Sequence, residues 1–260
     1  IDSGRLVREV KAHRSSVFAV AFAHDGSFFV TGGKDKRVKV WSTSTGKQLH
    51  SFDAAGTVLS VDVSCSGLIA ACGDRLVRVW NPNVPSSKST AKPATPGVLY
   101  DQRILGIAFD VDGVWSGDAL GRVRVWDVER GEERRTFTSD GPISRFAQCN
   151  GLFASADEKG AVVVRECTRG DLIWGVDGLG RVDFIALDQE GRLTVVADAH
   201  VHVHDRSGER VRSRPIADFF RGYRLASLDG RYLVYPTSNG HTILDLETGA
   251  ARQVMPQLAG

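Results

Sequence analysis

Short apolar runs alternate with turn residues along the first fifty positions of the chain. The order is an apolar run at Val17–Phe22, a His-Asp-Gly turn, a run at Phe28–Thr31, a glycine-rich turn and a run at Val38–Trp41. A fourth run, Lys47–Phe52, follows the turn at 43–46. Runs of this length that are rich in β-branched and aromatic residues and bounded by Gly and Asp predict antiparallel strands joined by hairpins.

This order recurs further along the chain, for example at Ile104–Phe109, Val114–Ser116, Val123–Trp126 and Glu133–Phe137. Six segments align on their last residue: RVKVW at Trp41, LVRVW at Trp80, RVRVW at Trp126, AVVVR at Arg165, HVHVH at His204 and GHTIL at Leu244. A period near 40 residues is typical of propeller blades, in which stacked four-stranded sheets bury faces that one sheet cannot bury alone.

The predicted fold class is therefore all-β, a β-propeller of four-stranded antiparallel blades with six blades countable, or seven if the chain is a fragment. We predict one domain over residues 1–260. Its expected units are approximately 11–53, 54–97, 98–137, 138–177, 178–216 and 217–256, with a spare outer strand at 3–10.

Two segments carry a family resemblance. VTGGKDKRVKVWSTSTGKQLHSF and VWSGDALGRVRVWDVERGEERRTF resemble WD repeats, strongly over residues 5–137 and weakly beyond about 165. The resemblance implies a buried hydrogen-bonded network of His, Ser or Thr, Asp and Trp within a blade, and a buried Asp or indole N–H is costly unless paired. The matching residues are His13, Thr31, Asp35 and Trp41 in the first unit, Asp74 and Trp80 in the second, and Ser116, Asp118 and Trp126 in the third.

Composition limits the function classes. Lys and Arg number 33 against 31 Asp and Glu, a net charge of +2 that gives no dedicated nucleic-acid surface. No apolar run is long enough to cross a bilayer, which needs roughly 20 residues, and the N-terminus carries no signal-peptide pattern. The four cysteines match no metal or disulfide spacing, and as small buried hydrophobes they indicate a reducing compartment, cytoplasmic or nuclear.

One segment has the composition of a chemical site. His200, His202 and His204 share one face of a predicted strand, and a His-x-His pair on a strand can hold zinc. The alternative is that the segment is a third blade strand with His204 at the Trp position, which we prefer. Since nucleophile and phosphate-binding motifs are also absent, we expect no enzyme activity, no resident metal and no cofactor. A propeller enzyme or metal-binding protein using these histidines is the alternative from a different class.

The expected function is a non-enzymatic scaffold or adaptor that binds other proteins or peptides through its loops. The resemblance implies that contacts gather on the loops leading into each blade and on those between its second and third strands. The residues in or near these loops are Arg14, Lys34, Arg103, Arg145, Glu158, Arg181 and Asn239. A subunit of an RNA-processing complex or of a ubiquitin ligase would also suit the fold, and the oligomeric state stays open. The Pro- and Ser-rich stretch Asn81–Gly97 is predicted to be a surface loop, or alternatively a partner-binding or phosphorylated segment.

Overall fold

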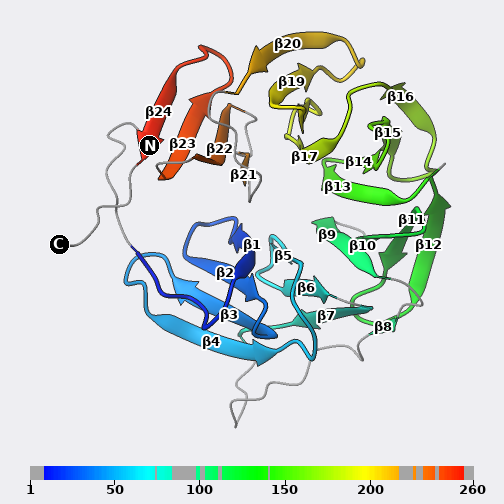
Figure 1. Ribbon diagram of the computed structural model, residues 1–260. Helices are drawn as coiled ribbons and strands as arrows, with labels where there is room; N and C mark the ends of the chain where they lie inside the picture. Colours follow the sequence, from blue (N-terminus) through cyan, green and yellow to red (C-terminus); the bar gives the residue numbers. More distant parts are fainter. Residues whose placement is uncertain are drawn as a thin grey trace. The chain divides into compact units, whose positions relative to one another are not determined.

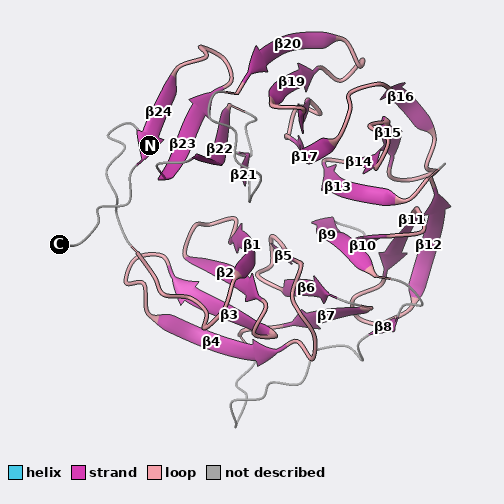
Figure 2. Ribbon diagram, viewed as in Figure 1, coloured by secondary structure: helices cyan, strands magenta, loops and turns pink. Residues whose placement is uncertain are grey.

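The described residues form β-strands and turns without any helix (Figure 2). The computed structural model describes residues 9–73, 75–83, 98–99, 103–110, 113–139, 141–216, 225–226, 231–237 and 240–254. Their strands make six antiparallel sheets of four strands each, numbered here sheet 1 to sheet 6 in chain order (Figure 1). The predicted all-β propeller class with six countable blades is confirmed, and sheets 1 to 6 are blades 1 to 6 of that fold.

The first three sheets take their strands consecutively from the chain. Sheet 1 consists of β1 (Val17–Phe22), β2 (Phe28–Gly33), β3 (Arg37–Ser42) and β4 (Gln48–Asp53). Sheet 2 consists of β5 (Ser60–Val63), β6 (Ile69–Gly73), β7 (Leu76–Trp80) and β8 (Val98–Leu99). Sheet 3 consists of β9 (Ile104–Asp110), β10 (Gly113–Asp118), β11 (Arg122–Trp126) and β12 (Glu133–Thr138).

The last three sheets follow the same plan. Sheet 4 consists of β13 (Ile143–Cys149), β14 (Leu152–Asp157), β15 (Val162–Glu166) and β16 (Leu172–Val176). Sheet 5 consists of β17 (Val182–Leu187), β18 (Leu193–Ala197), β19 (His200–His204) and β20 (Arg210–Pro215). Sheet 6 consists of β21 (Leu225–Ala226), β22 (Tyr232–Thr237), β23 (Gly240–Asp245) and β24 (Ala251–Val254).

The chain forms two compact units, one of which is Val10–Phe146, called here the N-terminal unit, while the other continues from Ala147 and is called the C-terminal unit. Single-domain organisation stays a prediction. Of the Pro- and Ser-rich stretch only 81–83 are described, so the rest of that loop lies outside the described residues, as do 3–8 of the spare strand.

Alternation along the strands decides which side chains are buried in the N-terminal unit. On β3, Val38 and Val40 are fully buried and pack with Val30 and Phe52 against Ile69 of sheet 2. The intervening Arg37 and Lys39 point to the other face, because successive side chains of a strand alternate. The opposite face of sheet 2 packs on sheet 3 through a second apolar cluster, so each of these two pairs of sheets shares one apolar core.

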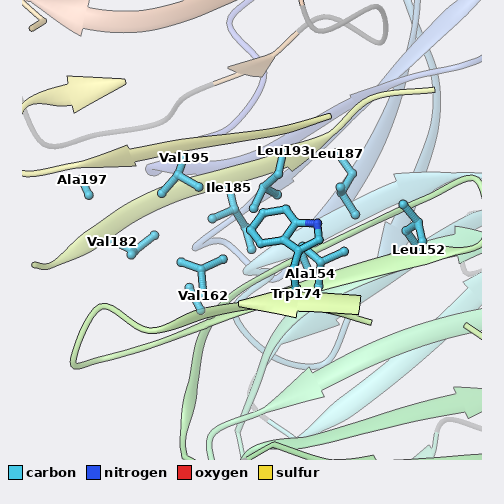
Figure 3. Packing of buried hydrophobic residues seen from close by; sticks show 12 residues of the cluster. Leu152, Ala154, Val162, Trp174, Val182, Ile185, Leu187, Leu193, Val195 and Ala197 are labelled. Atoms are coloured by element: carbon cyan, nitrogen blue, oxygen red, sulfur yellow. The ribbon is translucent and has the colours of Figure 1, made fainter. Parts of the chain in front are cut away.

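The C-terminal unit is built in the same way. Sheets 4 and 5 enclose a core in which the Trp174 ring lies against Ile185 and Leu193 (Figure 3). Val201 and Val203, on the other side of β19, pack with Leu233 of sheet 6. Burial of these faces supplies the main stabilisation, at about 25 cal/mol per Å² of apolar surface.

The cysteines are all free thiols, and their surroundings differ from one another. Cys72 and Cys167 are buried, and burial raises the pKa of the Cys72 thiol to about 12, which keeps it protonated and inert. Cys65 is exposed at the turn between β5 and β6. The expectation that every cysteine is a small buried hydrophobe is therefore wrong for Cys65, because the apolar run beside it ends before the turn.

Candidate functional site

Four side chains of the N-terminal unit form a continuous hydrogen-bonded chain in sheet 1. The indole Nε1 of Trp41 donates to Thr31 Oγ1 over 2.9 Å, and that oxygen lies 2.8 Å from His13 Nε2. His13 Nδ1 lies 2.7 Å from Asp35 Oδ1. Since Thr31 Oγ1 already accepts from the indole, its own proton is directed to Nε2, and Nδ1 then carries the ring proton and donates to Asp35. The chain joins the segment before β1 to three elements of the sheet.

Asp35 is held as a carboxylate by this arrangement. Burial opposes its ionised form, but the hydrogen bond from His13 and the amides of Arg14 and Arg37 outweigh it and lower the pKa of Asp35 below its ordinary value. The side chain of His13 is completely buried. Asp35 therefore anchors the turn between β2 and β3 to the leading segment, which we define as the residues just before the first strand of a sheet.

Sheets 2 and 3 depart from this network in different ways. In sheet 3 the Trp126 indole donates to Ser116 Oγ over 3.1 Å, whereas Asp118 binds Arg122 Nε over 2.9 Å instead of a histidine. In sheet 2 the pairing of Trp80 with Ile69 places Ala71 where sheet 1 has Thr31. Within the described residues, the buried Trp80 Nε1 has no hydrogen-bond partner. Asp74 lies outside the described residues.

The C-terminal sheets replace the Trp by other residues without losing register. Arg165 donates through Nη1 to the carbonyl of Gly170 over 3.1 Å, and His204 donates through Nδ1 to that of Gly208 over the same distance. Each of these bonds closes the turn into the outer strand. Leu244 is buried in the core shared with sheet 5.

The three histidines of β19 do not form a ligand set. His204 is buried and stacks on Trp174 of sheet 4 at 5.4 Å between centroids, while His200 is exposed and donates from Nδ1 to the Asp198 carbonyl. His202 Nδ1 lies 3.1 Å from Ser213 Oγ, and burial, then the charge of Arg210 and the neighbouring histidines, lower its pKa. Across the described ranges, no group of three or more His, Cys, Asp or Glu side chains could hold a metal ion.

Exposed loops of the N-terminal unit meet in pairs. The amide of Lys34, in the β2–β3 turn, donates to the carbonyl of Ser16 in the leading segment over 2.9 Å. In sheet 3 the amide of Ala119 donates in the same way to Arg103, which just precedes β9. The side chains of Arg14, Lys34 and Arg103 are exposed. A leading segment and a second–third-strand turn thus form one surface in each of these sheets.

In the C-terminal unit a second–third-strand turn meets the segment that leads into the following sheet. A Cβ on Gly160, in the β14–β15 turn, would lie 2.1 Å from the carbonyl oxygen of Gly180, so this turn touches the segment leading into sheet 5. Glu158 and Arg181 are exposed on these two loops. Arg145 instead lies within β13 and is partly buried, and Asn239 falls outside the described residues.

Comparison with known proteins adds a family match. The family described as "WD domain, G-beta repeat" matches residues 4–42 and 46–81. Protein tipD of Dictyostelium discoideum is 28% identical over 143 residues, 54% of this chain and 22% of that protein. Small ribosomal subunit protein RACK1y of rice (Oryza sativa subsp. japonica) is 28% identical over 131 residues, 48% of this chain and 38% of that protein.

Residues 4–42 and 46–81 thus match WD repeats, and the six sheets have the strand plan of a β-propeller. Autophagy-related protein 16 of Arabidopsis thaliana is similar too, at 25% identity over 137 residues, 50% of this chain and 26% of that protein. The chain therefore spans well under two thirds of the length of these relatives. The family match covers sheet 1 and the first three strands of sheet 2, although all six sheets share one strand plan. The described residues include no helix that could span a membrane.

A second kind of contact, from a strand cation to a backbone carbonyl, was not predicted from the sequence. In blade 1, Lys39 Nζ donates to the carbonyl of Ala12 over 2.6 Å, and in blade 2, Arg78 donates to that of Asp53 over 3.1 Å. Both cations stand two residues before the Trp of their sheet. Lys39 binds the segment that precedes β1, and Arg78 binds the end of β4 in the neighbouring sheet. RVKVW and LVRVW both show a cation two residues before the Trp, but the strand sequence does not tell which carbonyl that cation meets.

Proposed function

We propose that this WD-repeat chain is a non-enzymatic scaffold or adaptor that docks other proteins or peptides. The observation that carries the proposal is the pairing of leading segments with second–third-strand turns. It gathers exposed charged side chains of both signs onto fixed loops: Arg14, Lys34 and Arg103 in one unit, Glu158 and Arg181 in the other. Binding residues on loops that a rigid scaffold positions are the usual arrangement of a docking surface.

Rigidity of these loops supports the docking role. The β2–β3 turn is held by Asp35 and by the Lys34 amide, and the amide of Ala54, after β4, donates to the Lys36 carbonyl over 2.9 Å. In blade 3 the amide of Ser139 donates to Gly121 in the same manner. Loops that are already ordered lose little conformational entropy when a partner binds, which favours affinity.

Nucleic acid is a weaker candidate partner because many cations are already paired. Arg122, Arg134 and Arg192 form ion pairs with Asp118, Asp127 and Asp188 at 2.9, 2.6 and 2.7 Å. Arg231 pairs with Asp245 at 3.1 Å. Phosphate backbones bind through cations that remain available, so these pairs reduce the expected affinity. Membership in an RNA-processing or ubiquitin-ligase complex would be one form of the proposed docking role.

Affinity purification with quantitative mass spectrometry tests the proposal. The tagged chain is compared with a variant carrying Arg14→Ala, Lys34→Ala and Arg103→Ala. The control carries Arg130→Ala and Arg169→Ala, which lie on turns between the third and fourth strands of their sheets. We expect specific partners that are lost from the first variant and retained by the control. Retention of every partner by the first variant would refute the assigned loops. Stoichiometric zinc on the purified chain, lost in His202→Ala, would instead support the metal-binding alternative.

A further inference from the structure

Blade 1 contains an open hollow of about 500 Å³. Its lining residues come from the leading segment, from β3 with the turn before it, and from β4: Arg14, Asp35, Arg37, Lys39, Gln48 and Ser51. All of them belong to the N-terminal unit. The hollow is therefore a feature of one blade and of the segment that leads into it.

The strand register explains why these side chains meet. Lys39 is paired with Ser51, and Arg37 with Asp53, so each pair points to the same face of the sheet. Val38 and Val40 point to the opposite face, into the core shared with blade 2. The polar side chains therefore collect on the face of blade 1 turned away from blade 2.

Positive charge exceeds negative charge in the lining. Arg14, Arg37 and Lys39 face one carboxylate, Asp35, which already accepts from His13. The Arg14 guanidinium has no hydrogen-bond or ion-pair partner among the described residues, and Arg37 reaches Asp53 only at 3.9 Å with 41% of its side chain exposed. Lys39 donates one of its three N–H groups to the Ala12 carbonyl, which leaves two for a ligand.

We propose that this hollow binds a phosphorylated serine or threonine side chain of a partner protein. The proposal rests on the docking function above and names the chemistry of one of its contacts. A phosphate monoester carries about −1.5 to −2 charge at neutral pH and three acceptor oxygens. The two guanidinium groups, the remaining ammonium N–H groups and the Ser51 hydroxyl supply donors for those oxygens from three chain segments, an arrangement that suits a tetrahedral ion.

A carboxylate side chain satisfies this site less well. It carries one charge and two oxygens in a plane, whereas the donors stand on the leading segment, β3 and β4 and approach from different sides. Asp35 and Asp53 also repel an anion, so the ligand with more charge and more hydrogen bonds is favoured. A glutamate in place of the phosphorylated residue should therefore bind weakly.

The test measures fluorescence anisotropy of the full 260-residue chain with labelled nonapeptide pools. The pools have random flanking residues and a central phosphoserine, serine or glutamate. We expect the phosphoserine pool to bind at least tenfold more tightly than the other two, with affinity falling as salt rises. Arg14→Glu combined with Arg37→Glu should abolish that preference. Arg130→Glu combined with Arg169→Glu changes the net charge equally without replacing any lining residue and should retain the preference.

Three outcomes would overturn the proposal. Equal affinity for the phosphoserine and serine pools would do so, as would equal loss in both double variants. Binding of phosphoinositide vesicles in preference to the peptide pool would assign the hollow to a membrane surface instead. The docking function is judged separately with Arg37→Glu alone, because Arg37 lines the hollow but is not among the docking residues. Protein partners that persist in that chain leave the scaffold role intact even if this site fails.

Discussion

Trp80 in blade 2 has the same strand position as Trp41 in blade 1, but the residue beside its indole N–H is Ala71, whose side chain cannot accept a hydrogen bond. In blades 1 and 3, Thr31 and Ser116 supply that acceptor. Trp80 is 1% exposed, so its indole N–H is removed from bulk solvent, and it has no hydrogen-bond partner among the described residues. A buried donor without an acceptor costs about 1–3 kcal/mol.

Ala71→Ser should therefore stabilise the chain. The new hydroxyl would accept from Trp80 Nε1 as Ser116 accepts from Trp126, and the free energy of unfolding should rise by about 1 kcal/mol. Urea denaturation followed by tryptophan fluorescence measures it. Ala70→Ser is the matched control, since Ala70 faces the opposite core and a hydroxyl there should destabilise. Equal effects of the two substitutions would contradict the assignment.

Thr31→Val should destabilise blade 1, because it removes the oxygen that joins Trp41 to His13. Two buried groups then lose their partner, and the expected loss is about 2 kcal/mol of unfolding free energy. Thr31→Ser keeps the hydroxyl and should lose much less. A double-mutant cycle of Thr31→Val with Trp41→Phe should show a coupling of at least about 0.5 kcal/mol, and strict additivity would mean that the bond contributes nothing.

The His13–Asp35 pair should make stability fall in acid. The pKa of Asp35 is lowered in the folded chain, so its contribution is present above the unfolded pKa and is lost as the pH falls through the folded one. Unfolding free energies of the parent chain and of Asp35→Asn, measured from pH 7 downward, should converge in acid. A constant difference between them across that range would show that the carboxylate charge is irrelevant.

Asp62 should produce the opposite slope at higher pH. Its carboxylate accepts from the amides of Val63 and Phe109 at 2.8 and 2.6 Å, but burial dominates and raises its pKa from 3.8 to about 6. A raised carboxyl pKa stabilises the fold below the unfolded pKa, and that stability is lost as the pH rises through about 6. The loss amounts to about 3 kcal/mol at about 1.4 kcal/mol per unit.

Asp62→Asn isolates this effect. The Asn side chain has one oxygen and can accept from only one of the two backbone amides at any pH. Only the change in unfolding free energy between pH 4 and 7 is therefore informative. We expect the parent chain to lose stability relative to Asp62→Asn over that interval. Carbon NMR of the carboxyl group gives its pKa directly, and a value near 4 would remove the basis of the prediction.

The strand plan of the first and third blades could be predicted because it is written in local chemistry. Val17–Phe22 is predicted and observed with the same bounds, and Ile104–Phe109 is extended by only one residue. β-Branched runs and Gly or Asp at the breaks act over a few residues, so a window of sequence contains the necessary information.

Other features depend on which neighbour a side chain meets, and the sequence does not contain that directly. Arg37 and Lys39 line a hollow because the opposite face of β3, with Val38 and Val40, packs on blade 2. Arg122 instead forms an ion pair with Asp118. Arg37 and Arg122 are nevertheless the first residues of the similar strand sequences RVKVW and RVRVW. Similarly, nothing in LVRVW signals that Trp80 lacks an acceptor, because Ala71 lies nine residues earlier on another strand.

Arg165, His204 and Leu244 hold the Trp position of blades 4 to 6 while the strand register is kept. Backbone pairing and turn spacing thus define the repeating unit, and the residue at that position can change from an aromatic to a cation or an aliphatic. Duplicated blades are accordingly free to diverge in sequence without changing shape. Tryptophans at that position mark only three of the six repeats, whereas the interval between turns marks all six.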